Sequence, residues 1–204
     1  MERPKNISDF TAAILAGGKN TRFSGKNKAK MIINGRPLIE RTIDVLQAVF
    51  NDIIIITNNK DEFGKYKHIR IAGDIYHNIG PLGGLHSALR NTDKEVVFIV
   101  ASDMPGLSID TIRYIVRKFE ETRCEVLIPR YQGHIEPLHA IYTRQILGRL
   151  EDFIKSERNY SIREFLKLVD DKYLVIEDKG SSRSPFLNIN RPEDLPDGAG
   201  IRST

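Results

Sequence analysis

Two consecutive glycines, Gly17 and Gly18, directly follow the short apolar run 12–15. Glycines after a strand let backbone N–H groups turn toward one point, and no Cβ blocks a ligand that approaches them. The next residues include five cations: Lys19, Arg22, Lys26, Lys28 and Lys30. An open and cationic loop suits a polyphosphate, although glycines alone would equally mark a turn beside a solvated basic loop.

An acidic residue, Asp103, follows the predicted strand 95–101 and stands before the turn residue Pro105. A carboxylate at the end of a central strand is well placed to hold a divalent metal ion. An aspartate that initiates a turn is a common structural alternative. The residues alone leave both interpretations open.

A second small-residue turn, Gly80-Pro81-Leu82-Gly83-Gly84, leads into a predicted helix through Leu89. Such a turn is also typical of a helix start that packs closely on its neighbours. Asn58 follows a run of four isoleucines in the predicted strand 52–57, and Asp74 follows a shorter predicted strand, 69–72. Together with the glycine loop, these residues favour a nucleotide site.

Strands and helices alternate along the chain, which predicts an α/β protein with three layers and a mostly parallel central sheet. Thr11–Leu15 should be the first, central strand because it is apolar without alternation. The predicted site residues all follow strands, so they should meet in one crevice at the carboxyl ends. We expect a single domain over residues 1–195 and a loose tail over 196–204. A capping box, Ser161-x-x-Glu164, predicts a helix through Leu168.

Five segments resemble the molybdenum cofactor guanylyltransferases, the MobA family of nucleotidyltransferases. They are the loop with Leu15-Ala16-Gly17-Gly18, Arg22, Gly25 and Lys28 that runs on to Asn34–Leu38, G-P-L-x-G at 80–84, S-D-x-P at 102–105, P-L-x-A-x-Y at 137–142, and N-x-N-x-P-E-D at 188–194. The resemblance spans residues 14–195 and implies the Rossmann-like nucleotidyltransferase fold.

The resemblance also implies a reaction: GMP is transferred from GTP to molybdenum-bound molybdopterin, and pyrophosphate is released. It implies Mg²⁺ on Asp103, with Lys28, Arg22 and Asp103 as catalytic residues. The implied nucleotide-binding residues are Leu15, Ala16, Gly17, Gly18, Lys28, Asn58, Asp74, Gly80, Pro81, Leu82 and Asp103. On the acceptor side it implies Pro137, Asn188 and Asn190.

One position departs from the family pattern, because Asn27 stands where the family has aspartate before the lysine. Lys26 is therefore a rival to Lys28. A related transferase that uses CTP on molybdopterin, or an NTP on a sugar phosphate, remains an alternative. So does a nucleotide-binding regulatory protein without activity.

The composition of the chain limits the classes of partner that it is expected to bind. The chain has 204 residues, of which 40% are hydrophobic and 28% charged, and a net charge of +4 that favours anionic ligands. Much of the early basic charge lies in the glycine loop and no nucleic-acid-binding module is recognisable, so we expect no nucleic acid partner. No apolar run approaches the ~20 residues of a membrane span, and residues 1–10 do not show the apolar core that is typical of a signal peptide. We expect a cytoplasmic enzyme with no membrane partner, and other proteins of molybdenum cofactor biosynthesis are candidate partners.

Overall fold

The computed structural model describes residues 7–17, 29, 31–33, 35–156, 159–177, 186 and the backbone of 201–202. The strands are β1 (Phe10–Leu15), β2 (Ile32–Ile33), β3 (Arg36–Pro37), β4 (Asp52–Ile56), β5 (Arg70–Ala72), β6 (Val96–Ala101), β7 (Val126–Tyr131), β8 (His134–Ile135), β9 (His139–Thr143), β10 (Asp171–Ile176) and β11 (Ile201–Arg202). The helices are α1 (Leu38–Gln47), α2 (Pro81–Arg90), α3 (Ile109–Glu121), α4 (Leu147–Ser156) and α5 (Ile162–Leu166), with 3₁₀ turns η1 (Ile7–Asp9), η4 (Lys60–Phe63) and η5 (Arg144–Ile146).

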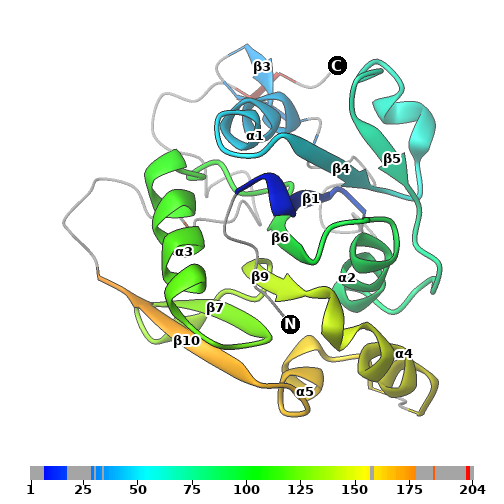
Figure 1. Cartoon of the computed structure of the whole chain (residues 1–204). Coiled ribbons are helices and arrows are strands. Elements are labelled where there is room, and N and C mark those ends of the chain that lie inside the picture. Colours follow the sequence, from blue (N-terminus) through cyan, green and yellow to red (C-terminus); the bar gives the residue numbers. More distant parts are fainter. Residues whose placement is uncertain are drawn as a thin grey trace.

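The main sheet has the strand order β10-β7-β9-β6-β1-β4-β5, and β8 pairs with β7 outside this path. β6, β1, β4 and β5 are parallel neighbours, and β10 is parallel to β7. β9 is antiparallel to both β6 and β7, so β7 runs in the same direction as β6. The predicted mostly parallel sheet is therefore confirmed, with β9 as an antiparallel insertion (Figure 1).

Helices cover both faces of this sheet and complete three layers. α1 and α3 pack on one face, and α2, α4 and α5 pack on the other (Figure 1). All six residues of β1 are buried: Ala12 and Ile14 face the α1 and α3 side, whereas Ala13 and Leu15 face the α2 side. A strand that is buried on both faces must be apolar throughout, which explains the lack of alternation in its sequence.

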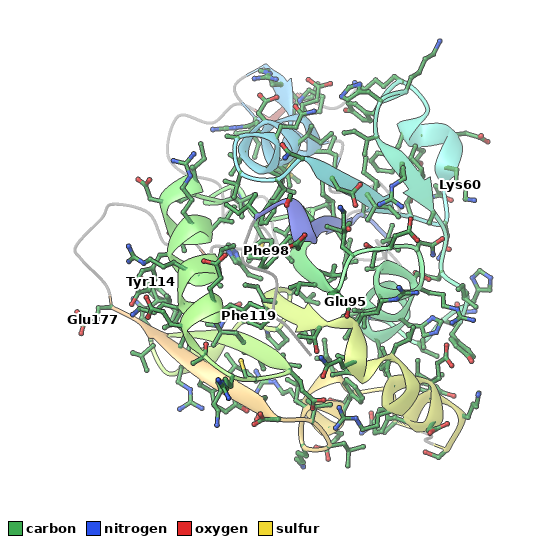
Figure 2. All side chains as sticks on the ribbon, viewed as in Figure 1. Lys60, Glu95, Phe98, Tyr114, Phe119 and Glu177 are labelled. Atoms are coloured by element: carbon green, nitrogen blue, oxygen red, sulfur yellow. The ribbon has the colours of Figure 1, made fainter. Side chains whose placement is uncertain are left out.

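Aromatic side chains fill the layer beneath α1 and α3. Phe50 stacks on Phe98 at 5.4 Å between ring centroids, and Phe119 meets Phe10 edge-on at 6.0 Å. Figure 2 shows Phe98 in the interior, whereas Lys60 and Glu177 lie at the periphery. This packing fixes β6 and β1, the two strands whose ends carry the predicted catalytic loops.

A helix begins after Ser161 as predicted, but it is shorter than expected and the predicted capping box does not form. α5 ends at Leu166, and the Ser161 side chain accepts no capping hydrogen bond. The Glu164 carboxylate instead accepts hydrogen bonds from Lys167 Nζ at 2.8 and 2.6 Å. A glutamate held by this ion pair does not reach back to the helix start.

A second, small sheet has the order β11-β2-β3. Gly35, with φ 79°, lies in the turn between β2 and β3, as the Asn34-Gly35 pair predicts. Ile201–Arg202 lie in the tail that the sequence predicts to be loose, yet they pair with β2. Among the described helices, none has the length and apolar character needed to cross a membrane.

Candidate functional site

The carboxyl ends of four parallel strands form one continuous row. Hydrogen bonds extend the ladders past the strand ends: Ser102 N–H donates to Leu15 O at 3.1 Å, and Ala16 N–H donates to Ile56 O at 2.9 Å. Thr57 N–H donates to Ala72 O at 2.8 Å. These bonds fix the first residues after β6, β1 and β4, and the last residue of β5, side by side, which is where open α/β sheets bind ligands.

The glycine loop leaves this row from β1. Leu15 and Ala16 are buried, whereas Gly17 is exposed and a Cβ added there would meet nothing within 4 Å. A ligand can therefore approach the backbone closely at Gly17. Gly18, Arg22 and Lys28 lie outside the described residues, so their predicted roles remain predictions.

Asn58 and Asp74 bind each other across the ends of β4 and β5. Asn58 Nδ2 donates to Asp74 Oδ2 at 2.8 Å, and Asp74 N–H donates to Asn58 Oδ1 at 2.9 Å. This reciprocal pair fixes the Asp74 carboxylate with one oxygen, Oδ1, not engaged by Asn58. A preorganised acceptor of this kind can bind a donor pair on a ligand.

The first turn of α2 lies against both Leu15 and Asp74. Gly80 precedes the helix with φ 64° and ψ −148°, a conformation that favours glycine, and Pro81 occupies the first helical turn. A Cβ at Gly83 would lie 2.7 Å from Tyr76 O and 3.7 Å from Asp74 Cγ, and one at Gly84 would lie 3.2 Å from two Leu15 methyl carbons. Gly83 and Gly84 thus let the first turn of α2 pack against Tyr76 O and the Leu15 side chain more closely than larger residues would allow.

Asp103 stands two residues beyond β6 and is partly buried. Ser102 is tied to Leu15, so the Asp103 backbone lies at the same row of strand ends as the glycine loop. Among the described residues, no group of three or more His, Cys, Asp or Glu side chains could hold a metal by itself. A single carboxylate can hold Mg²⁺ when phosphate oxygens and water supply further ligands, as in many nucleotide sites.

Pro137, which is predicted to lie on the acceptor side, stands just before β9, the strand that neighbours β6 on the side away from β1. Leu138 O accepts a hydrogen bond from Ala101 N–H at 3.0 Å, and Pro137 O accepts one from the Tyr142 hydroxyl at 2.7 Å. Burial raises the pKa of Tyr142, so this hydroxyl remains a donor. Asn188 and Asn190 lie outside the described residues.

Phe186, two residues before Asn188, packs beside β9 and β7. Its ring lies 4.9 Å from the His139 ring and 5.4 Å from the Tyr131 ring, between centroids. Phe98 contacts His139 edge-on at 5.3 Å. Both His139 ring nitrogens are buried without a hydrogen-bond partner among the described residues, and burial lowers the pKa of His139 to about 3.

Acid should destabilise the protein partly through His139. In unfolded chains histidine binds a proton below about pH 6.5, whereas folded His139 stays neutral down to about pH 3, so the unfolded state binds more protons in between. The free energy of unfolding should therefore fall on acidification by up to about 1.4 kcal/mol per pH unit from this residue. Urea unfolding measures this free energy between pH 7 and pH 4.5. It should fall less steeply with pH in His139→Leu than in the wild type, whereas His68→Leu, which replaces an exposed histidine, should keep the wild-type dependence. If the free energy of unfolding depends equally on pH in all three proteins, His139 is not a source of the destabilisation by acid.

Sequence reasoning missed two residues near the acceptor side, Arg130 and Glu136. Arg130 is the fifth residue of β7, and Glu136 directly precedes Pro137. Both side chains are partly buried. A charged residue next to the P-L-x-A-x-Y segment is the signal that could have drawn attention to Glu136.

The family model of the MobA-like NTP transferase domain matches residues 12–173. A relative from Thermococcus kodakarensis, named probable molybdenum cofactor guanylyltransferase, is 36% identical over 189 residues, 90% of this chain and 90% of that protein. A molybdenum cofactor guanylyltransferase from Syntrophotalea carbinolica is 32% identical over 189 residues, 91% of this chain and 88% of that protein.

Solved structures share the fold. Molybdopterin-guanine dinucleotide biosynthesis protein A from Archaeoglobus fulgidus superposes with a TM-score of 0.76 and 25% identity, covering 90% of this chain and 94% of that chain. A 4-diphosphocytidyl-2C-methyl-D-erythritol synthase from Anaerococcus prevotii superposes with a TM-score of 0.69 at 14% identity, over 93% and 95% of the two chains. The second similarity concerns the fold alone. The Rossmann-like architecture predicted from the sequence is confirmed.

Proposed function

Because the chain belongs to the MobA-like NTP transferase domain family, we propose that it transfers the guanylyl group of GTP to molybdenum-bound molybdopterin. The observation that carries the proposal is the row of strand ends, where the glycine loop, the Asn58–Asp74 pair, the start of α2 and Asp103 lie together. Two relatives, each about as long as this chain, bear the name of this activity.

The reaction joins an oxygen of the acceptor's phosphate to the α-phosphorus of GTP. The bond between this phosphorus and the bridging oxygen to the β-phosphate breaks, and pyrophosphate leaves with the electron pair. The attacking phosphate is already an anion near neutral pH, so the chain needs no strong general base. Its residues must position two highly charged groups and neutralise their repulsion.

Lys28 and Arg22 supply positive charge to the triphosphate, and backbone N–H groups of Gly17 and Gly18 cradle it. The Ala16 N–H, which the sequence also predicts to face the phosphates, instead donates to Ile56 O within the sheet. The exposed and unobstructed Gly17 supports a close approach of the phosphates to the backbone. The start of α2 adds the partial positive charge of a helix N-terminus near the same edge.

Asp103 is the residue that holds Mg²⁺ in this proposal. A single carboxylate at a strand end would hold an ion whose other ligands come from water and substrate phosphates. When bound, Mg²⁺ screens the charge of the phosphates and of the departing pyrophosphate. Asp103 and the Ser102 backbone then position this charge beside β1, where the glycine loop begins.

Asp74 is the residue that reads the base. A carboxylate accepts hydrogen bonds from guanine N1–H and the 2-amino group together, and Asn58 holds this carboxylate in place at 2.8 Å. Adenine and cytosine do not present the same donor pair. They would leave the fixed carboxylate without its partners, which is costly in a desolvated site.

We expect GTP to bind at least about tenfold more tightly than CTP or ATP, a difference of about 1.4 kcal/mol. Calorimetry with each nucleotide and Mg²⁺ measures this preference directly. Asp74→Asn should remove most of it, because an amide offers one acceptor and would place a donor against the donors of guanine. Asp61→Asn, on the exposed turn η4, is the matched control and should keep the wild-type preference.

Pyrophosphate release with molybdenum-loaded molybdopterin tests the activity itself. Turnover with GTP but not with CTP or UTP supports the proposal. Turnover with CTP, or with a sugar phosphate as acceptor, would assign a related transferase instead. Tight GTP binding without pyrophosphate release would indicate a nucleotide-binding protein that has lost catalysis.

A further inference from the structure

Two oppositely charged side chains beside the acceptor loop do not pair with each other. Arg130 lies near the end of β7, and Glu136 follows the β7–β8 hairpin. Both are partly buried, and neither forms an ion pair of 4.0 Å or less within the part of the chain that the structure describes. Partly buried charges normally have partners, so this pair suggests a site that a ligand completes.

The Arg130 guanidinium is held from one side by an aromatic ring. Its central carbon lies 4.4 Å from the centroid of the Tyr173 ring, on the neighbouring strand β10. Arg130 Nε is fully buried and has no hydrogen-bond partner among the described residues. The cation–π contact orients the guanidinium but satisfies none of its donors.

Glu136 is fixed by its backbone, while its carboxylate accepts no hydrogen bond from the residues that the structure describes. Its N–H donates to Pro129 O at 2.9 Å, and its carbonyl accepts from His139 N–H at 3.0 Å. Burial raises the pKa of the Glu136 carboxyl, and the nearby charge of Arg163 offsets only part of this rise. Donors from a ligand would stabilise the carboxylate that the fold leaves without them.

The position of these residues fits the far end of the acceptor. β7 and β6 run in the same direction, and the segment from β8 to β9 lies between them. This segment pairs with the end of β7 at Arg130 and bonds the end of β6 through Leu138 O and Ala101 N–H. An acceptor whose phosphate meets the nucleotide at the end of β6, beside Asp103, can extend over β9 toward the end of β7. Figure 1 shows β7 and β10 on the side of the sheet away from β4 and β5.

We propose that Glu136 and Arg130 form the subsite that recognises the pterin ring of the acceptor. Glu136 accepts hydrogen bonds from the ring N3–H and the 2-amino group, and Arg130 donates to the 4-carbonyl oxygen. This inference rests on the proposed function, because molybdopterin is the acceptor there. Glu136 and Arg130 bind the substrate away from the reacting phosphates.

The chemistry of the pterin edge matches this pair of residues. The pyrimidinone part of a pterin presents two donors and one carbonyl acceptor in the same order as guanine. A carboxylate is the side chain that accepts both donors at once, and a guanidinium donates to the carbonyl beside them. The protein would then read the same pattern at two ends of the site, with Asp74 for guanine and Glu136 for the pterin.

Pteridine binding separates this reading from non-specific attraction. The probes are 6-hydroxymethylpterin and 6-hydroxymethyllumazine, in which a 2-oxo group replaces the 2-amino group, and binding is followed by their fluorescence. The wild type should bind the pterin about tenfold more tightly than the lumazine, because the lumazine places an acceptor against Glu136. Glu136→Gln should abolish this preference, and Arg130→Met should weaken both ligands similarly, since both carry the 4-carbonyl.

Matched controls come from the opposite face. Arg117 lies over the Tyr114 ring at 5.4 Å on α3, so Arg117→Met removes another arginine–tyrosine contact without touching the proposed subsite. Glu120→Gln neutralises an exposed carboxylate on the same helix. Both controls should retain the pterin preference. In turnover, Glu136→Gln should raise the KM for molybdopterin about tenfold and leave kcat within about twofold, while GTP affinity stays unchanged.

The outcomes distinguish the subsite from the activity. If the wild type forms the guanine dinucleotide, yet Glu136→Gln keeps the wild-type pterin preference and KM, the subsite is wrong and the proposed function stands. If the wild type discriminates pterin from lumazine through Glu136 but forms no dinucleotide, the subsite stands and the activity does not. Absence of saturable pterin binding by the GTP-loaded wild type would also overturn the subsite.

Discussion

Replacing Asp103 with alanine should lower guanylyl transfer by at least ~10³-fold, because the metal that we propose for this carboxylate would supply several kcal/mol of charge stabilisation. The fold should survive, since Asp103 lies in a turn beyond β6 and not among the buried side chains of the core. The midpoint of thermal unfolding of Asp103→Ala should differ from that of the wild type by no more than about 4 °C. Pyrophosphate release at increasing Mg²⁺ concentrations and a thermal melt measure the two effects.

Asp93→Ala is a suitable control for this experiment. Asp93 is exposed in the turn that precedes β6, at the amino edge of the sheet, and its removal should leave turnover unchanged. If Asp103→Ala keeps nearly normal Mg²⁺-dependent turnover, Asp103 is not the metal ligand. A large drop in the unfolding midpoint would assign it a structural role instead, as a turn residue.

The central strands could be predicted because their burial leaves a direct record in the sequence. Ile53–Ile56 are consecutive, and the structure divides them between the two faces, with Ile53 and Ile55 toward α1 and α3 and the other two toward α2. Only a strand covered on both faces requires this pattern. The site residues that follow such strands therefore fall at one edge without further information.

The acceptor side was less predictable because it depends on strand order. β9 follows β7 in the chain, yet it inserts between β7 and β6 and runs antiparallel to both. Nothing local in residues 139–143 specifies these neighbours. The contact between Arg130 and Tyr173 also requires β10 to return beside β7, which joins residues far apart in sequence.

The hydrogen bonds between side chains across the site also could not be predicted from the sequence. Asn58 and Asp74 were each predicted to contact the nucleotide, but their mutual hydrogen bonds join positions 16 residues apart. These bonds exist because β4 and β5 are adjacent and parallel. The sequence therefore predicts which residues face the ligand, and the structure adds how Asn58 orients the carboxylate.

Lys28→Ala should reduce kcat by ~10²–10³-fold, by analogy with the loss of one preorganised charge donor in other active sites. Lys26→Ala should cost less than ~10-fold. Both lysines follow the glycine loop, and either could attract a triphosphate from solution. Long-range attraction is screened beyond ~8 Å at physiological salt and does not distinguish the transition state from the ground state. A catalytic cation must touch the oxygens whose charge grows during transfer.

The neighbouring residue Ala29 supports Lys28 over Lys26. Ala29 is 0% exposed and belongs to the same buried cluster as Ala16, which follows β1, and Met104, which follows Asp103. The chain at residue 29 is therefore anchored in the core on the α1 and α3 face of the sheet. Lys28 is attached directly to this anchor, whereas Lys26 is three residues from it. A short tether limits the positions of the ammonium group, and preorganisation is what makes a charge donor catalytic.

Single-turnover and steady-state kcat for the two variants, measured at one fixed ionic strength, decide between the lysines. Lys19→Ala serves as a third variant that removes one positive charge from the same loop, so a uniform electrostatic effect would lower all three rates alike. A loss confined to Lys28→Ala would assign the contact with the triphosphate to that residue. A larger loss at Lys26→Ala would mean that Asn27, in place of the family's aspartate, accompanies a shifted loop register, in which Lys26 and not Lys28 reaches the phosphates.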